Sequence, residues 1–355
     1  MRILIRKPEP LFGNTLKREV QFMGEPIKQA HSFQHITDLA QFPDKLRGGV
    51  VAIGNFDGVH RGHRAVLDLA RDEAAKRGVP ALAMTFEPHP RTFFRPDQPV
   101  FRLTPAHVKA EIFEAEHLDG VIELPFTKEF GGMAAEDFVK DILVGRLGIS
   151  QSITGYDFHF GKGRQGTPEF LEQAGEAHGF AVTIVGAEGD EGGEIISSSR
   201  IRAALAEGEL AVANGLLGYR YFVEATVQHG EKRGRELGYP TANLKLADNC
   251  ELKEGVYAVQ IKIDGVMHDG VASFGRRPTF DDGAPLLEVH VFDFTGDLYE
   301  KPVTVCFVGF IRAELKFDGI EALISQMDQD SAEARAMIAS MRPLSHLDQM
   351  LNADG

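Results

Sequence analysis

The sequence of 355 residues has no tryptophan, only two cysteines and fewer positive than negative charges. Cys250 and Cys306 are too few for a disulfide framework or a cysteine-built zinc site. We therefore interpret both as ordinary core or strand residues and expect a reducing, cytoplasmic setting. No stretch approaches the roughly 20 apolar residues that a membrane-spanning helix needs. The first apolar run stops after Ile5, which is too short for the core of a signal peptide.

The formal net charge of −14 and the pI near 5.4 argue against nonspecific binding to nucleic acid, because such binding depends on neutralising phosphates. A small local basic pocket is still compatible with this balance. Hydrophobic residues at 43% and charged residues at 25% are ordinary for a globular protein. The length favours two domains, and the composition leaves open whether the chain forms a homo-oligomer.

Residues 1–30 are interrupted by prolines and glycines and carry no clear periodicity. We interpret them as a loosely ordered extension, or as an artefact of start-site choice, since Met23 could also begin the protein. A short helix is expected over 35–46, and the first strand over 50–53.

Strands and helices then alternate up to about residue 185, with apolar spacing near 3.6 in the helices. This order predicts an α/β domain with a parallel sheet and helices on both faces. Ligands of such sheets bind at the carboxyl ends of the strands. Further helices are expected over 65–76, 105–117, 134–147, 168–178, 199–207 and 209–217, and further strands over 80–86, 121–124, 152–154 and 181–185.

After about residue 208 the pattern changes to short strands separated by turns, which predicts a small antiparallel β-barrel. Asp264-Gly265 is a strong hairpin signal between two of these strands. We expect strands over 221–228, 255–263, 270–274, 286–292 and 301–310, and a C-terminal helix over 319–341.

The stretch Gly54–His63 reads as a loop between a strand and a helix. A helix start offers free N–H groups and a partial positive charge, so it suits phosphate. His60 and His63 could be charged donors to phosphoryl oxygens. Alternatively both are structural, or they bind zinc with His89 or Asp57 as a third ligand. The phosphate hypothesis also explains the glycines and the helix start, although the stretch is not a Walker loop.

Three further clusters are candidates. In residues 196–202 three serines precede a helix that opens with two arginines. They form either a serine N-cap with solvated arginines or a polyphosphate site. Residues 230–243 form either a charged hairpin tip or a second phosphate site, in which Thr241 and Asn243 offer oxygens to Mg²⁺. Glu288 should point away from Leu287 and Val289 on its strand, either as a surface residue or as a general base.

In order along the chain, these motifs closely resemble the bacterial bifunctional riboflavin kinase/FAD synthetase family, from about residue 48 to about 340. Gly54–His63 is similar to the family's nucleotidyltransferase loop, and Phe86-Glu87-Pro88-His89-Pro90 to its second motif. Residues 155–161 and 196–202 resemble the third and fourth motifs. Residues 240–243 resemble the kinase signature, with Glu288 at the position of the catalytic glutamate.

The resemblance implies a Rossmann-like FMN adenylyltransferase domain over 31–207 and a riboflavin kinase barrel over 208–355. ATP would phosphorylate riboflavin in the barrel, with Mg²⁺ bound through ATP, and a second ATP would adenylylate the resulting FMN. The implied catalytic residues are His60, His63 and Glu288. The residues implied to bind the nucleotide and its phosphates are Gly54, Asn55, Ser198, Arg200, Arg202, Gly230, Lys232, Gly234, Thr241 and Asn243. The residues implied to contact the flavin are Phe56, Pro88, Phe158 and Phe160.

Some positions depart from the family pattern. His159 stands where arginine is frequent, Ser199 where threonine is frequent, and Ser273-Phe274-Gly275-Arg276 where Asn-Ile-Gly-Thr is common. The last departure could alter a wall of the kinase pocket. Two other functions compete with this one. A nucleotidyltransferase for another phosphorylated metabolite leaves 240–243 and Glu288 unexplained, and a non-catalytic flavin or nucleotide sensor would not need the reactive side chains.

Overall fold

The computed structural model describes residues 33–230, 238–276 and 284–352. The described residues from Phe33 onward form one compact unit. The predicted extension over 1–30 lies outside the described residues, as do Lys232 and Gly234 of the predicted kinase loop.

The first half forms a six-stranded parallel sheet in the order β1-β4-β3-β2-β5-β6. This order confirms the predicted α/β class. The strands are β1 Gln34–Ile36, β2 Val50–Ile53, β3 Ala81–Glu87, β4 Gly120–Pro125, β5 Gln151–Gly155 and β6 Ala181–Val185.

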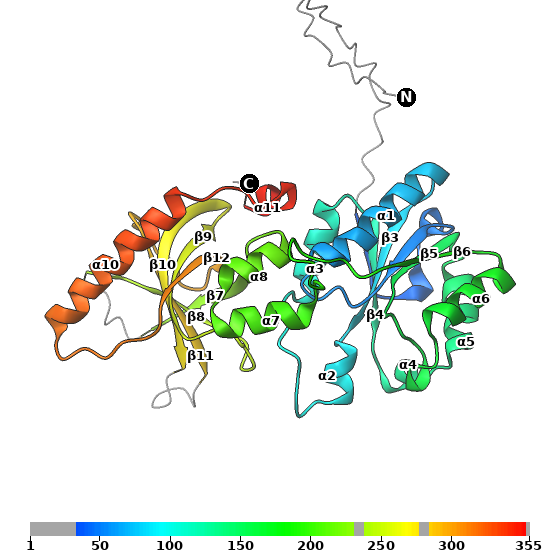
Figure 1. Ribbon diagram of the computed structural model, residues 1–355, viewed down its shortest axis with the longest axis horizontal. Helices are drawn as coiled ribbons and strands as arrows, with labels where there is room; N and C mark the ends of the chain where they lie inside the picture. Colours follow the sequence, from blue (N-terminus) through cyan, green and yellow to red (C-terminus); the bar gives the residue numbers. More distant parts are fainter. Residues whose placement is uncertain (1–32, 231–237, 277–283, 353–355) are drawn as a thin grey trace, which may run out of the picture. The chain divides into compact units, whose positions relative to one another are not determined.

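Alternate residues of the central strands pack against opposite layers of helices, because successive side chains of a strand point to opposite faces. Val50 and Ala52 of β2 join the core beneath α1 Arg61–Arg77 and α3 Ala106–Ala115. Val51 and Ile53 join the core beneath α6 Pro168–His178. Figure 1 shows the sheet between these helices. The remaining helices of this half are α2 Pro90–Phe94, α4 Lys128–Gly131, α5 Ala135–Asp137 and a π-helix Phe138–Arg146, with short 3₁₀ turns at Leu39–Gln41, Asp44–Leu46 and Lys162–Arg164.

The helix predicted over 35–46 is wrong. The segment forms edge strand β1 and two 3₁₀ turns. Asp38 caps the first turn through its side chain. Pro43 precedes the second turn, and a proline disfavours helical backbone at the residue before it, here Phe42, which is extended. Pairing with β4 decides the conformation of β1, and the local sequence carries no signal for that distant partner.

The second half confirms the predicted antiparallel barrel, which is closed in the order β10-β11-β8-β7-β12-β9. Asp264 and Gly265 both have positive φ, at 50° and 87°, and they form the predicted hairpin turn. α7 Ser198–Glu207 and α8 Leu210–Leu217 precede the barrel. The barrel strands are β7 Phe222–Gln228, β8 Ala242–Lys245, β9 Gly255–Ile263, β10 Val266–Arg276, β11 Pro285–Val291 and β12 Pro302–Arg312.

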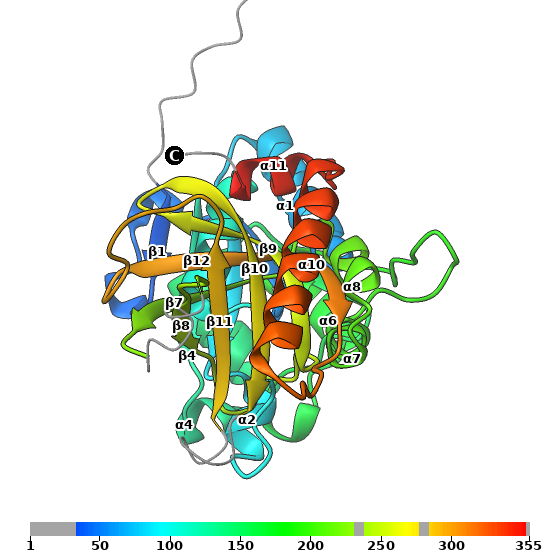
Figure 2. The ribbon, with the colours of Figure 1, turned by 90° about the vertical axis from the view of Figure 1, so that its left-hand side faces the viewer.

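The predicted C-terminal helix is α10 Ile320–Ala339, which packs on the outside of the barrel. Figure 2 shows it lying along β9 and β10. Ala334 and Ile338 of α10 contact Ala258 and Phe292 of the barrel. A further short helix, α11 His346–Leu351, follows it. Within the described ranges no helix is both long and apolar enough to cross a bilayer.

Candidate functional site

The predicted phosphate loop joins the carboxyl end of β2 to the start of α1. His60 is the N-cap of α1, and its Nδ1 accepts a hydrogen bond of 3.2 Å from the backbone N–H of His63. The two imidazole rings stack with their centroids 3.6 Å apart. Phe56 meets the His63 ring edge-on at 5.4 Å. The structure therefore brings the two predicted histidines together at a helix start, where they can bind an anion.

Gly54 allows the loop to fold this tightly. A Cβ on Gly54 would lie 3.1 Å from the ring of Phe56, whose own φ is 48°. The Phe56 ring is 1% exposed and packs edge-on against Phe113. In this conformation Phe56 supports His63 from the core and offers no face to solvent, so its predicted place beside the flavin stays a prediction.

Burial of the two histidines opposes the positive charge that a charged donor would carry. Burial lowers the pKa of His60 to about 4. Burial also lowers the pKa of His63 well below its usual value, and repulsion from His60 when it is protonated and from Lys109 adds to this effect. Both imidazoles are therefore neutral at pH 7. Because Nδ1 of His60 accepts a hydrogen bond, its proton lies on Nε2, from which it can still donate to a phosphoryl oxygen.

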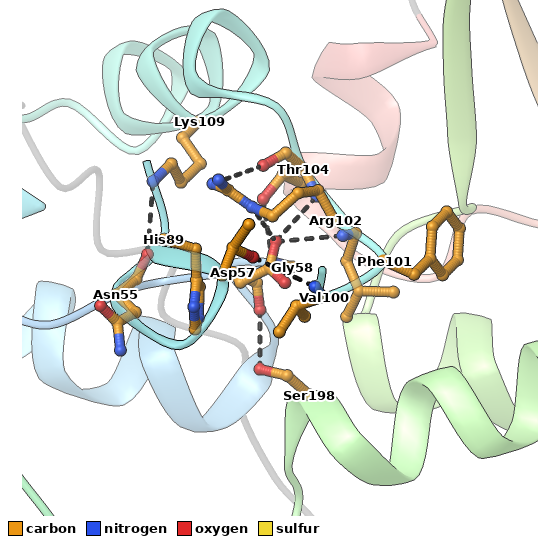
Figure 3. Close-up of polar contacts among 12 residues, drawn as sticks. Asn55, Asp57, Gly58, His89, Val100, Phe101, Arg102, Thr104, Lys109 and Ser198 are labelled. Carbon is orange, nitrogen blue, oxygen red and sulfur yellow. Dashed lines mark hydrogen bonds and ion pairs between the residues drawn. The ribbon is translucent and has the colours of Figure 1, made fainter. Parts of the chain in front are cut away.

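The fourth motif lies against the same loop. Ser197 is the N-cap of α7, and the hydroxyl of Ser198 donates to the backbone carbonyl of Asp57 at 2.8 Å. Arg202 pairs with the Asp57 carboxylate and donates to the carbonyl of Phe101 at 2.6 Å. Figure 3 shows Ser198 reaching the loop. These side chains hold the loop in place, and their predicted contacts with nucleotide stay predictions.

Arg200 points to the loop that precedes α7. Its guanidinium pairs with Asp190 at 2.6 Å and with the more exposed Glu194 at 3.0 Å. A nucleotide phosphate would compete with these carboxylates for the same N–H groups.

The other three flavin-side candidates, Pro88, Phe158 and Phe160, fall into two places. Pro88 is exposed at the end of β3, next to α2. Phe158 is half-buried and stacks on Phe160 at 5.5 Å, whereas Phe160 itself is 7% exposed. The sequence analysis missed an aromatic cluster beside Pro88 that includes Phe94, which is 63% exposed. Its other rings include Phe86, Phe93, Phe126 and Phe130.

In the barrel, the register brings the kinase candidates into one polar row. Glu288 of β11 lies opposite Asn243 of β8 and opposite Ser273 of β10. Leu287 and Val289 are fully buried, so Glu288 points to the other face of β11, as the alternation predicted. Thr241 immediately precedes β8, and its carbonyl accepts a long hydrogen bond of 3.4 Å from the Asn243 amide.

Two neighbours complete this row. A Cβ on Gly230 would lie 2.4 Å from Nδ2 of Asn243, so the backbone two residues after the end of β7 packs closely on the amide. His290 donates from Nδ1 to the carbonyl of Pro240 at 2.9 Å, which fixes the turn before β8. Arg276, in the stretch that departs from the family pattern, donates to the carbonyls of Asp248 and Cys250.

The sequence analysis also missed a buried cluster of charges behind the phosphate loop. Asp57 is 2% exposed and accepts from the backbone N–H groups of Leu103 and Thr104. Lys109 of α3 is 1% exposed. The sequence holds one signal for its burial: Lys109 is a charged residue at helical spacing from Ile112 and Phe113, on the apolar face of the helix.

Comparison with known proteins gives two family matches. The family model for FAD synthetase matches residues 42–200, and the one for riboflavin kinase matches residues 217–338. The chain is 43% identical to the bifunctional riboflavin kinase/FMN adenylyltransferase of Pseudomonas fluorescens, over 86% of this chain and 98% of that protein. It is 39% identical to the Listeria monocytogenes enzyme of the same name, over 82% of this chain and 93% of that protein.

A solved structure is similar over nearly the same span. It is described as a macrolide-efflux protein from Streptococcus pneumoniae, and it superposes with a TM-score of 0.75 at 31% identity. The match covers 85% of this chain and 98% of that one, so both halves of the fold recur there in one chain.

Proposed function

The chain belongs to the bifunctional riboflavin kinase/FMN adenylyltransferase family, and from this premise we propose which of its residues carry each reaction. The kinase activity transfers a phosphoryl group from ATP to riboflavin and gives FMN, and the second activity joins FMN to AMP and gives FAD. Neither alternative function is favoured, because a riboflavin kinase model matches the barrel and the relatives are named as enzymes. We propose 31–207 and 208–355 as the limits of the two domains.

For adenylyl transfer, we assign the phosphate loop to ATP. An FMN phosphate oxygen attacks the α-phosphorus, the bond from the α-phosphorus to the bridging oxygen breaks, and pyrophosphate leaves. Neutral His60 and His63 donate N–H to the oxygens on which charge develops, which is where preorganised donors act most strongly. The observation that carries this assignment is the stacked histidine pair at the start of α1.

Backbone N–H groups from Gly54 to the start of α1 add to this binding site, together with Asn55 and Ser198. Arg200 exchanges Asp190 and Glu194 for the nucleotide phosphates, and Arg202 supports the loop through Asp57. The flavin lies toward Pro88 and Phe158. The exposed ring of Phe94 provides a flat apolar surface there, because aromatic rings favour stacking.

For the kinase reaction, we assign the polar row of the barrel. The Glu288 carboxylate takes the proton of the riboflavin 5′-hydroxyl as its oxygen attacks the γ-phosphorus of ATP, and ADP leaves. Thr241 and Asn243 position the nucleotide, and Gly230, Lys232 and Gly234 bind its phosphates. Positioning and neutralisation of charge supply most of the catalysis in phosphoryl transfer.

Mg²⁺ fits the donors of this row. In residues 33–230, 238–276 and 284–352 no group of three His, Cys, Asp or Glu residues could hold a metal ion. Mg²⁺ prefers oxygen ligands and is often held largely by substrate phosphates and water. The hydroxyl of Thr241 and the amide oxygen of Asn243 are such ligands, so we propose that Mg²⁺ arrives bound to ATP. There it neutralises the phosphate charge. A cytoplasmic location and a homo-oligomer stay predictions.

The test incubates the protein with riboflavin, ATP and Mg²⁺ and separates the flavins chromatographically. His63→Ala should lower the rate of FAD formation by about 100- to 1,000-fold while FMN accumulates, since one preorganised donor is worth that much. Glu288→Gln should lower FMN formation by about 100-fold or more and leave added FMN convertible to FAD. FAD formation at the parent rate in His63→Ala would refute our assignment of the loop.

A further inference from the structure

Lys109 of α3 is buried in the core of the first domain. It is 1% exposed, and Val108 and Ile112 on the same helix are also buried. Lysine is almost never fully buried unless its charge is paired. Burial lowers the pKa of Lys109, and the Glu87 carboxylate opposes this shift. A methionine would fill the same space at a lower desolvation cost, so the ammonium group itself needs an explanation.

Three oxygens surround the ammonium nitrogen of Lys109. Oε1 of Glu87 and Oγ1 of Thr85 each lie 2.8 Å away, and the backbone carbonyl of Asn55 lies at 3.4 Å. An ammonium group has three N–H donors and no acceptor, so the three oxygens account for all of its donors. The hydroxyl of Thr85 donates in turn to the carbonyl of Asn55 at 3.1 Å. Figure 3 shows Lys109 reaching Asn55.

These oxygens come from two neighbouring strand ends. Thr85 and Glu87 are among the last three residues of strand β3, and Asn55 lies near the start of the phosphate loop after β2. Lys109 therefore ties the loop to the strand that leads into Pro88 and His89. The carbonyl of Asn55 lies five residues before His60 in the chain, so its position sets where the loop begins its path to the histidine pair.

Glu87 is held from its other side by Arg102. The guanidinium forms two bonds to the carboxylate, at 2.7 and 2.6 Å. Together with Lys109, Arg102 lowers the pKa of Glu87 to about 2, against the opposing effect of burial. Nε of Arg102 also lies 3.5 Å from Asp57, whose carboxylate pairs with Arg202. The carboxylates of Glu87 and Asp57 are thus fixed by the three cations Lys109, Arg102 and Arg202 behind the loop.

We propose that Lys109 is a positioning residue for adenylyl transfer, which holds the Asn55 carbonyl against Thr85 and Glu87 and thereby fixes the loop that carries His60 and His63. This role rests on the proposed function of that loop. Lys109 is 1% exposed and all three of its oxygen partners belong to the protein, so its effect passes through the loop. A loop displaced by about 1 Å can cost about 100-fold in rate, because the donors then miss the oxygens of the transition state.

The charge of Lys109 supports the same role. It is one of the causes that lower the pKa of His63, after burial and the charge of His60. A residue that keeps the imidazole neutral keeps it as an N–H donor that also retains an acceptor nitrogen.

The experiment compares Lys109→Met with Lys76→Met, a matched control at an exposed lysine of α1 that pairs with Glu73 at 2.8 Å. Steady-state rates of FAD formation from FMN and ATP give kcat and KM, and riboflavin phosphorylation by the same chain reports whether the barrel is intact. Thermal unfolding checks that each variant is folded at the assay temperature. Thr85→Val, a nearly isosteric change, removes one acceptor of Lys109 and one donor to Asn55.

We expect kcat for FAD formation to fall about 10- to 100-fold in Lys109→Met, with KM for ATP within about threefold and kinase activity unchanged. Thr85→Val should lower the same kcat by a smaller factor, and Lys76→Met should match the parent. If Lys109→Met does not fold, a lowered kcat in Thr85→Val still supports the proposal. A parent-like kcat in a folded Lys109→Met, or in Thr85→Val when Lys109→Met does not fold, overturns it. The His63→Ala result is independent, so the proposed function can stand while this inference fails.

Discussion

At the scale of single residues, burial sets the protonation of the histidines beside the phosphate loop. His89 has a pKa of about 4, lowered first by burial and then by the cations Arg102, Arg202 and Lys109, while Asp57 opposes the shift. His60 has a similar pKa for the same main reason. In the unfolded chain both would titrate near their ordinary value of about 6.5. Between these two values the unfolded chain binds more protons than the folded one.

This difference predicts a pH-dependent stability. A pKa lowered by folding contributes stability that is complete above the unfolded value of about 6.5 and is lost as the pH falls toward about 4. The free energy of unfolding should therefore decrease from pH 7 to pH 4. His89→Asn keeps an acceptor for the N–H of Arg91 but cannot titrate. Urea unfolding at several pH values should give His89→Asn a shallower slope over this window, and identical slopes would contradict the prediction.

At the scale of elements, the sequence predicts well where periodicity and turn chemistry agree. The helix over 105–117 and the Asp264-Gly265 hairpin follow from apolar spacing and positive-φ residues, and both form. β1 and β8 were missed because each is three or four residues long and depends on a distant partner. Register between strands likewise decides that Glu288 faces Asn243, which no local pattern can give.

The candidate site likewise contains features that the sequence predicts and features that only the folded structure reveals. The loop from Gly54 to His63 was predictable, because its histidines, glycines and helix start are contiguous. The contacts of Lys109 were not, because Asn55, Thr85 and Glu87 lie on other elements and only the folded sheet brings them together. The neutrality of the histidines depends on burial, which the sequence shows only indirectly.

A contact between elements predicts how β11 supports the kinase turn. His290 of β11 donates to the carbonyl of Pro240, and its ring lies 4.9 Å from that of Tyr239. His290→Phe keeps an aromatic ring and removes the N–H donor. A hydrogen bond of about 1 kcal/mol is worth about fivefold in an equilibrium constant. We therefore expect KM for ATP in riboflavin phosphorylation to rise about two- to tenfold, with adenylyl transfer unchanged.

The matched control for this change is His268→Phe. His268 lies on β10 of the same barrel, and its ring meets Phe294 edge-on. Kinase kinetics of both variants should be measured with riboflavin held saturating and ATP varied. Equal KM values for ATP in His290→Phe and the parent would show that the hydrogen bond to Pro240 does not position the nucleotide.

At the scale of the whole molecule, one chain holds two reactions in which the product of the first is a substrate of the second. The proposed residues of the two reactions do not overlap: His60 and His63 belong to the loop after β2, and Glu288 to a barrel strand. A defect in one reaction should therefore leave the other intact. FMN is a small anion, and it can pass between the two reactions through solution unless the protein retains it.

Mixing two defective variants tests this passage. His63→Ala should still make FMN, and Glu288→Gln should still adenylylate FMN. An equimolar mixture supplied with riboflavin, ATP and Mg²⁺ should therefore form FAD, although neither variant alone does so at an appreciable rate. Because FMN must first accumulate in solution, FAD should appear after a lag that shortens when the concentration of His63→Ala is raised. Flavins separated at successive times measure the lag. A mixture that accumulates FMN to saturating levels without forming FAD would show that the adenylyl-transfer site accepts only FMN made by its own chain.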